Sequence, residues 1–83
     1  MSENLAAAEV PRIWADWDQR DAAGRVWTFA ADSDQPQRLR PGVRVDAGPP
    51  GDVRPAVVVD VLTEPWRTVV LLREVSAGAG AAG

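Results

Sequence analysis

The sequence contains no cysteine, histidine, lysine or tyrosine, and its three serines lie at positions 2, 33 and 76. Without cysteine the chain forms no disulfide bond and offers no thiolate to a metal ion. Without histidine it lacks the commonest metal ligand and the commonest general base. These absences exclude zinc centres and Ser-His-Asp triads. We therefore predict that the protein is not an enzyme and uses no metal ion or cofactor.

Carboxylates are the remaining candidates for acid-base or cation chemistry. Asp16 and Asp18 point the same way from a predicted strand, and Asp21 follows in the next turn. The Asp-Ser-Asp segment at 32–34 has the oxygen ligands that Mg²⁺ and Ca²⁺ prefer, but neither group has the spacing of an EF-hand loop. We interpret both groups as solvated faces rather than as a catalytic or metal site.

Long hydrophobic runs are also missing. The three valines at 57–59 are followed at once by Asp60, and no stretch approaches the roughly 20 apolar residues that cross a bilayer. Residues 1–10 carry acidic rather than basic side chains, which is not the pattern of a signal peptide. We therefore expect a cytoplasmic protein with no membrane partner.

The charged residues comprise nine arginines against twelve acidic side chains, which gives a net charge of −3. Alanine and valine are abundant, while asparagine and isoleucine occur once each. This amino-acid composition is the one expected from the codon bias of a high-GC bacterial genome. The exclusive use of arginine is therefore no sign of a functional choice.

A chain of 83 residues is long enough for one domain only. Residues 1–9 are predicted as a tail or a short helix ahead of Pro11, and residues 76–83, which lack large apolar side chains, as a disordered Gly/Ala tail. The domain itself is predicted to span residues 10–75.

Within that domain the hydrophobic pattern has a period of two, and glycine and proline interrupt it often. The alternation predicts an all-β fold, a five-stranded antiparallel meander that curls into a small, partly open barrel. The predicted strands are 12–18, 25–31, 42–47, 55–62 and 66–75.

The first two predicted strands form a hairpin in this interpretation, with Gly24 at a positive φ in the turn. Placing Trp17 opposite Trp27 gathers Phe29 and the other apolar side chains of both strands on one face, so we expect Trp17 and Trp27 in the core. In that register Trp14 lies on the polar face.

The segment 39–45, Leu-Arg-Pro-Gly-Val-Arg-Val, precedes a valine-rich strand at 57–61 and a hairpin into 66–72. This arrangement resembles the SH3-like small barrels of KOW-type and related bacterial modules. The resemblance implies a fold and no functional residue. The acidic net charge and the absence of lysine differ from the KOW modules that bind nucleic acid.

Two tryptophan and arginine pairs are the predicted partner-binding residues: Trp14 with Arg12, and Trp66 with Arg67. Tryptophan and arginine are enriched at binding hot spots. We therefore predict a non-catalytic binding module whose partner is another protein. In the alternative interpretation, each indole is covered because the barrel closes or because the N-terminal helix packs back onto it.

A second hypothesis is RNA or DNA binding through a patch formed by Arg38, Arg40 and Arg44, since small barrels bind nucleic acid through aromatic and arginine side chains. The negative net charge opposes this hypothesis. A homodimer formed through an uncovered strand edge is a third outcome that the sequence leaves open.

Overall fold

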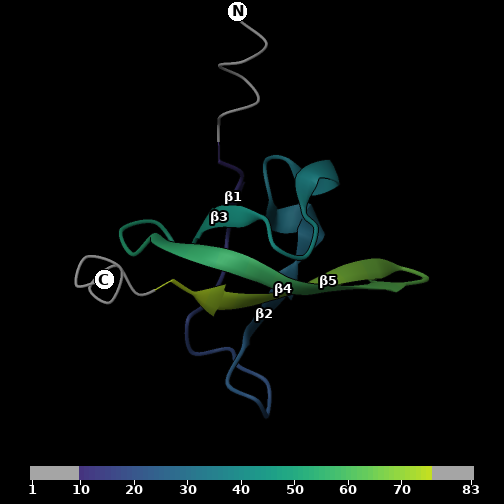
Figure 1. Cartoon of the computed structure of the whole chain (residues 1–83), viewed down its shortest axis with the longest axis horizontal. Helices are drawn as coiled ribbons and strands as arrows, with labels where there is room; N and C mark the ends of the chain where they lie inside the picture. The colour runs from purple at the N-terminus through teal and green to yellow at the C-terminus, as the bar shows by residue number, and fades with distance from the viewer. Residues whose placement is uncertain (1–9, 76–83) are drawn as a thin grey trace, which may run out of the picture.

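The computed structural model describes residues 10–75, so the tail or helix predicted at 1–9 and the tail predicted at 76–83 lie outside the described residues. The predicted fold class is confirmed, because the chain forms a five-stranded curled sheet that makes a half-barrel (Figure 1). Within residues 10–75 no helix is long and apolar enough to span a membrane. The elements are β1 (Arg12–Ile13), β2 (Val26–Phe29), the 3₁₀ turns η1 (Ala30–Asp32) and η2 (Pro36–Arg38), β3 (Arg44–Ala47), β4 (Arg54–Glu64) and β5 (Arg67–Glu74).

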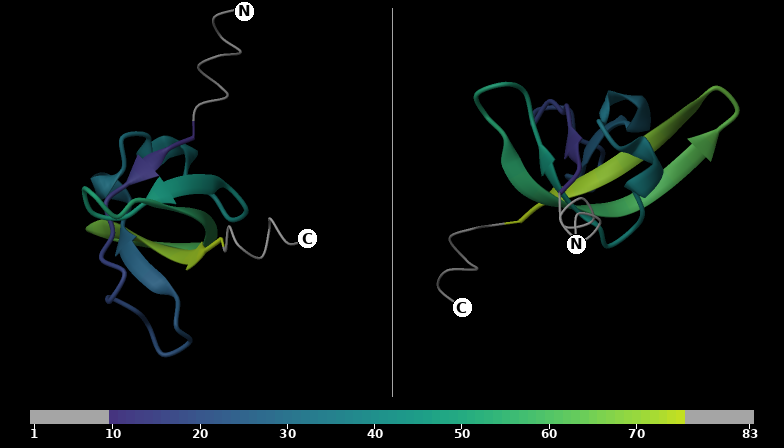
Figure 2. Two further views of the ribbon diagram at one scale, coloured as in Figure 1. Left: turned by 90° about the vertical axis from the view of Figure 1, so that its left-hand side faces the viewer. Right: turned by 90° about the horizontal axis from the view of Figure 1, so that it is seen from above.

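The strand order in the sheet is β1-β3-β4-β5-β2. Three of the four ladders are antiparallel as predicted, whereas β1 pairs with β3 in parallel. The predicted meander is wrong at its first two steps, because β2 forms its ladder with β5 and β3 lies beside β1 instead of β2. Figure 2 shows how this order curls the sheet around a central space, while the β4–β5 hairpin extends beyond it.

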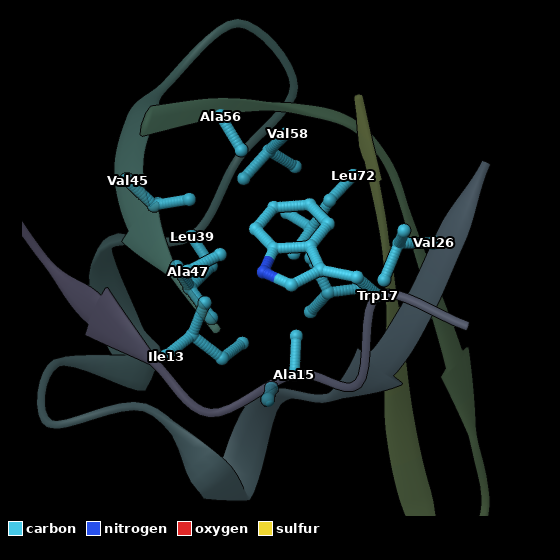
Figure 3. Close-up of a cluster of buried hydrophobic side chains, with 12 residues drawn as sticks. Ile13, Ala15, Trp17, Val26, Leu39, Val45, Ala47, Ala56, Val58 and Leu72 are labelled. Atoms are coloured by element: carbon cyan, nitrogen blue, oxygen red, sulfur yellow. The ribbon is translucent and has the colours of Figure 1, made fainter. Parts of the chain in front are cut away.

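The predicted first hairpin survives only as two isolated bridges, Ile13 with Ser33 and Arg20 with Val26. Both bridges are shifted by two residues from the register that sets Trp17 opposite Trp27. No continuous ladder forms between the two bridges, and the Trp17 side chain points into the interior of the half-barrel (Figure 3).

Trp17 fills the centre of the core and is only 6% exposed, as predicted. Its indole Nε1 donates a hydrogen bond of 2.9 Å to the carbonyl oxygen of Asp52, so the one polar atom of the ring is satisfied. Small and medium-sized side chains surround the indole in Figure 3. Those labelled there are Ile13, Ala15, Val26, Leu39, Val45, Ala47, Ala56, Val58 and Leu72.

β2 presents the opposite face to the one predicted. Val26 and Thr28 are buried, whereas Trp27 and Phe29 point outward and are partly exposed. The pairing of β2 with β5 explains this, because Thr28 lies opposite the buried Val70. Trp27 and Phe29 are therefore surface residues, and their predicted place beside Trp17 is wrong.

A β-bulge between Val58 and Asp60 interrupts the alternation of β4. Before the bulge Val58 faces the interior, and after it Val61 packs against the core while Leu62 is 45% exposed. The Asp60 carboxylate accepts a hydrogen bond of 2.8 Å from the backbone N–H of Val61. The extra residue thus exchanges the inward and outward positions along the projecting hairpin.

Candidate functional site

The structure places both tryptophans that were predicted to bind a partner at the surface. Trp14 is 47% exposed and Trp66 is 81% exposed, in contrast to the buried Trp17. The two indoles line different hollows, and Asp32 lines both of them. The two predicted tryptophan and arginine pairs therefore belong to two separate surfaces.

Trp66 occupies the two-residue turn between β4 and β5, directly after Pro65. Its neighbour Arg67 is fixed, because its Nε forms a 2.6 Å ion pair with Glu64 and its guanidinium carbon lies 5.3 Å from the centroid of the Phe29 ring. A hollow of about 370 Å³ lies beside this turn. Its lining residues are Phe29, Ala31, Asp32, Trp66, Arg67 and Thr68.

Apolar side chains continue from this turn across the side of the sheet that faces away from the core. In one cross-strand row Phe29 lies opposite Val69, which lies opposite the exposed Leu62. In the next row Trp27 lies opposite Leu71, and the Trp27 and Phe29 rings meet edge to face with centroids 5.7 Å apart. We call these five residues the outer face.

Trp14 lines a hollow of about 510 Å³ that we call the Trp14 groove. Two hydrogen bonds hold the Trp14 main chain: the Trp14 N–H donates to the Asp32 carbonyl at 3.1 Å, and the Trp14 carbonyl accepts a 2.8 Å bond from the hydroxyl of Thr28. The groove is lined by Arg12, Ile13, Trp14, Asp32, Asp34, Asp46, Gly48, Pro50 and Val53.

Arg12 lines the Trp14 groove as the sequence proposed, but its surroundings are acidic. Its main chain pairs with Asp34, because the Arg12 N–H donates to Asp34 Oδ1 at 2.9 Å and the Arg12 carbonyl accepts from the Asp34 N–H at 3.0 Å. Sequence reasoning had noted the acidic segment at 32–34 but did not place it beside Arg12, and it missed Asp46, which the β1–β3 pairing sets opposite Arg12.

The three arginines of the nucleic-acid hypothesis line neither hollow. Arg38 lies in η2 and donates to the side chain of Gln35 at 2.9 Å. Arg40 lies exposed in the turn before β3, and Arg44 is exposed on β3. Arg44 lies opposite Val57, whose other cross-strand neighbour is Arg73.

The carboxylates at 16–21 stabilise turns. Asp16 accepts a hydrogen bond from the Asp18 N–H, and Asp21 accepts from the Ala23 N–H and from both the N–H and the Nε of Arg25. The backbone hydrogen bond from Arg25 holds the pKa of Asp21 below its ordinary value. In the described part of the chain no three carboxylates are placed to hold a metal ion.

Compared with known proteins, the chain matches no family model, no curated protein and no solved structure. The resemblance to SH3-like and KOW-type barrels therefore stays a prediction. What the protein does must be argued from its own surfaces.

Proposed function

We propose that this domain is a non-catalytic binding module that engages another protein through Trp66 and the outer face. The observation that carries the proposal is the 81% exposure of Trp66 on a turn whose two flanking residues are tied together by the Glu64–Arg67 ion pair. An exposed indole on an ordered turn contributes a large apolar area to a contact at a low cost in conformational entropy.

The free energy gained by burying an indole supports this role for Trp66. A tryptophan buries about 150–250 Å² in a contact, which corresponds to roughly 4–6 kcal/mol at about 25 cal/mol per Å² before the costs of association. Leu62 and Phe29 extend the apolar area beside it. In a complex that covers Trp66 and the outer face, Trp66 would thus be the hot spot and the outer face the apolar area around it.

A protein fits this surface better than a phosphate backbone does. Arg67 is already paired with Glu64, and Asp60 adds a further negative charge to the same hairpin. Phosphate binding requires cations whose counterions are released on contact, and Arg67, the cation beside the Trp66 turn, is already paired.

The test is a two-dimensional amide spectrum of labelled protein, titrated with fractions of its own cell lysate with and without nuclease. We expect the Trp66 indole signal and the outer-face amides to shift, to keep shifting after nuclease treatment, and to respond weakly to salt. Trp66→Ala should abolish the shifts at unchanged stability, because the side chain contacts little in the folded domain.

Asp18→Ala is the control, since Asp18 is exposed and lines none of the hollows described here. Equal shifts in wild type and Trp66→Ala would show the proposal to be wrong. Shifts that disappear with nuclease and concentrate on Arg38, Arg40 and Arg44 would support nucleic-acid binding instead. Shifts that depend only on protein concentration would indicate a homodimer.

A further inference from the structure

The Trp14 groove is longer than one hollow. A second hollow of about 400 Å³ is lined by Val10, Arg12, Asp34 and Asp46, so it shares three residues with the first. Sites of about 300–1,000 Å³ are large enough to hold a ligand or a long side chain. The two adjoining hollows together suit an extended chain segment rather than a compact molecule.

The groove carries an excess of negative charge. Asp32, Asp34 and Asp46 line it against one cation, Arg12. Within residues 10–75 the side chains of Asp32, Asp46 and Arg12 have no hydrogen bond or ion pair, and the Asp34 carboxylate accepts only the Arg12 main-chain N–H. These carboxylates therefore keep acceptor capacity for an external donor.

The aromatic wall of the groove suits a cation as well. Trp14 lines the groove and is about half exposed, so part of its ring is accessible to a ligand. Hydrogen bonds to Asp32 and from Thr28 hold the main chain that carries it. Pro50 and Val53 supply apolar walls for the aliphatic stem of a long side chain. The domain uses the same pairing internally, where Arg54 lies 4.9 Å from the centroid of Trp17.

We propose that the Trp14 groove binds an extended basic segment of a partner protein, with one arginine side chain stacked on Trp14 and paired with Asp32 or Asp46. Charge complementarity selects this occupant. A bare metal ion fits poorly, because no three carboxylates of the described chain converge as ligands and half the wall is apolar. This site is independent of the proposed role of Trp66.

The probe is a blocked five-residue peptide with a central arginine between two valines, titrated into labelled full-length protein. The matched control peptide carries citrulline, which keeps the shape of arginine and removes its charge. We expect saturating shifts at the Trp14 indole with a dissociation constant on the order of 1 mM, and about three- to tenfold weaker binding of the citrulline peptide.

Two variants test the residues separately. Trp14→Ala removes the ring, and Asp46→Asn removes one charge; each should weaken the arginine peptide by about three- to tenfold. Asp18→Asn is the control, because Asp18 is exposed outside the groove. The Trp17 indole signal reports the fold in every variant, since that N–H is hydrogen-bonded inside the core.

Three results would overturn the proposal. The first is the absence of a saturating shift at Trp14. The second is equal binding of the arginine and citrulline peptides, which would leave no role for charge. The third is spermidine binding as tightly as the peptide, which would assign the groove to a small polyamine rather than to a protein segment. If Trp14→Ala does not fold, Asp46→Asn alone decides between the outcomes.

Discussion

The guanidinium of Arg54 lies over the indole of Trp17, with its carbon 4.9 Å from the ring centroid. Asp52 holds both partners. Its carboxylate binds Arg54 through two hydrogen bonds of 2.9 and 3.0 Å, and its carbonyl accepts the indole N–H of Trp17. Glu74 adds a third contact to Arg54 at 3.2 Å. The central core residue is thus covered by a charged group that is itself paired.

Arg54→Ala should lower the midpoint of chemical denaturation, because it removes the cation–π contact and uncovers the Trp17 ring. Chemical denaturation measures the loss, and the Trp17 indole signal should shift. Arg73→Ala is the matched control, since Arg73 is exposed and no described residue pairs with its side chain. Equal losses in both variants would contradict the covering role.

Acid should destabilise the domain through Asp21 and Asp52. Hydrogen bonds from Arg25 and Arg54 hold the pKa values of these two carboxyls below their ordinary value of 3.8. Since the folded pKa is lowered, the stabilisation is fully present above that value and is lost as the pH falls through the folded pKa. Melting temperatures between pH 7 and pH 2 should therefore fall mainly below about pH 4.

Asp21→Asn should melt with a smaller drop between pH 5 and pH 2 than the wild type, because one of the two shifted carboxyls is gone. Asp18→Asn serves for comparison, since no hydrogen bond to its side chain is present in the described chain. An unchanged acid profile in Asp21→Asn would refute the assignment.

Gly48→Ala should lower the free energy of unfolding by about 2–4 kcal/mol. Gly48 has a φ of +136°, and a Cβ there would overlap the Asp52 carbonyl oxygen and lie 2.8 Å from Nε1 of Trp17. The substitution therefore breaks the hydrogen bond that anchors the core indole. Gly51→Ala shares the positive φ but opens onto free space, and should cost only about 1 kcal/mol.

Thr28→Val should destabilise the domain by about 1–2 kcal/mol while keeping the shape of the buried side chain, because the Trp14 carbonyl loses its hydrogen-bond donor. The Trp14 indole signal should broaden or shift, since its main chain is no longer held to β2. Thr63→Val, at an exposed position, should change neither stability nor the Trp14 signal.

The strands from β3 onward could be predicted from the sequence, because their signals are local. Alternating valines indicate β3 and β4. Gly and Pro residues at 41–42 precede β3, and those at 48–51 separate β3 from β4. Gly24, predicted at a positive φ, has a φ of +82°. These features depend on neighbours within a few residues.

The orientation of β2 could not be predicted in this way. Both of its faces are largely apolar, with Val26 and Thr28 on one and Trp27 and Phe29 on the other. The choice depends on volume, because Trp17 already fills the small half-barrel and leaves room only for smaller side chains around it (Figure 3). The orientation of β2 therefore depends on how the whole core packs, which the local sequence pattern does not show.

Alternation along the chain placed Trp14 on the polar face and its neighbours Ile13 and Ala15 on the apolar face. In the structure Trp14 is exposed and both neighbours are buried, although the hairpin register was wrong. The acidic lining of the Trp14 groove could not be predicted from the sequence. Asp46 belongs to β3, which the parallel pairing brings beside Arg12 on β1.

The bulge at 58–60 also determines how the projecting hairpin meets other chains. Beyond Val58, β4 has a described strand partner on one side only, so its other edge is a template on which a foreign strand could be added. At that edge the Val61 amide is already occupied by the Asp60 carboxylate. An incoming backbone carbonyl meets a negative charge there instead of a free donor. Strand addition is therefore disfavoured at this point of the edge.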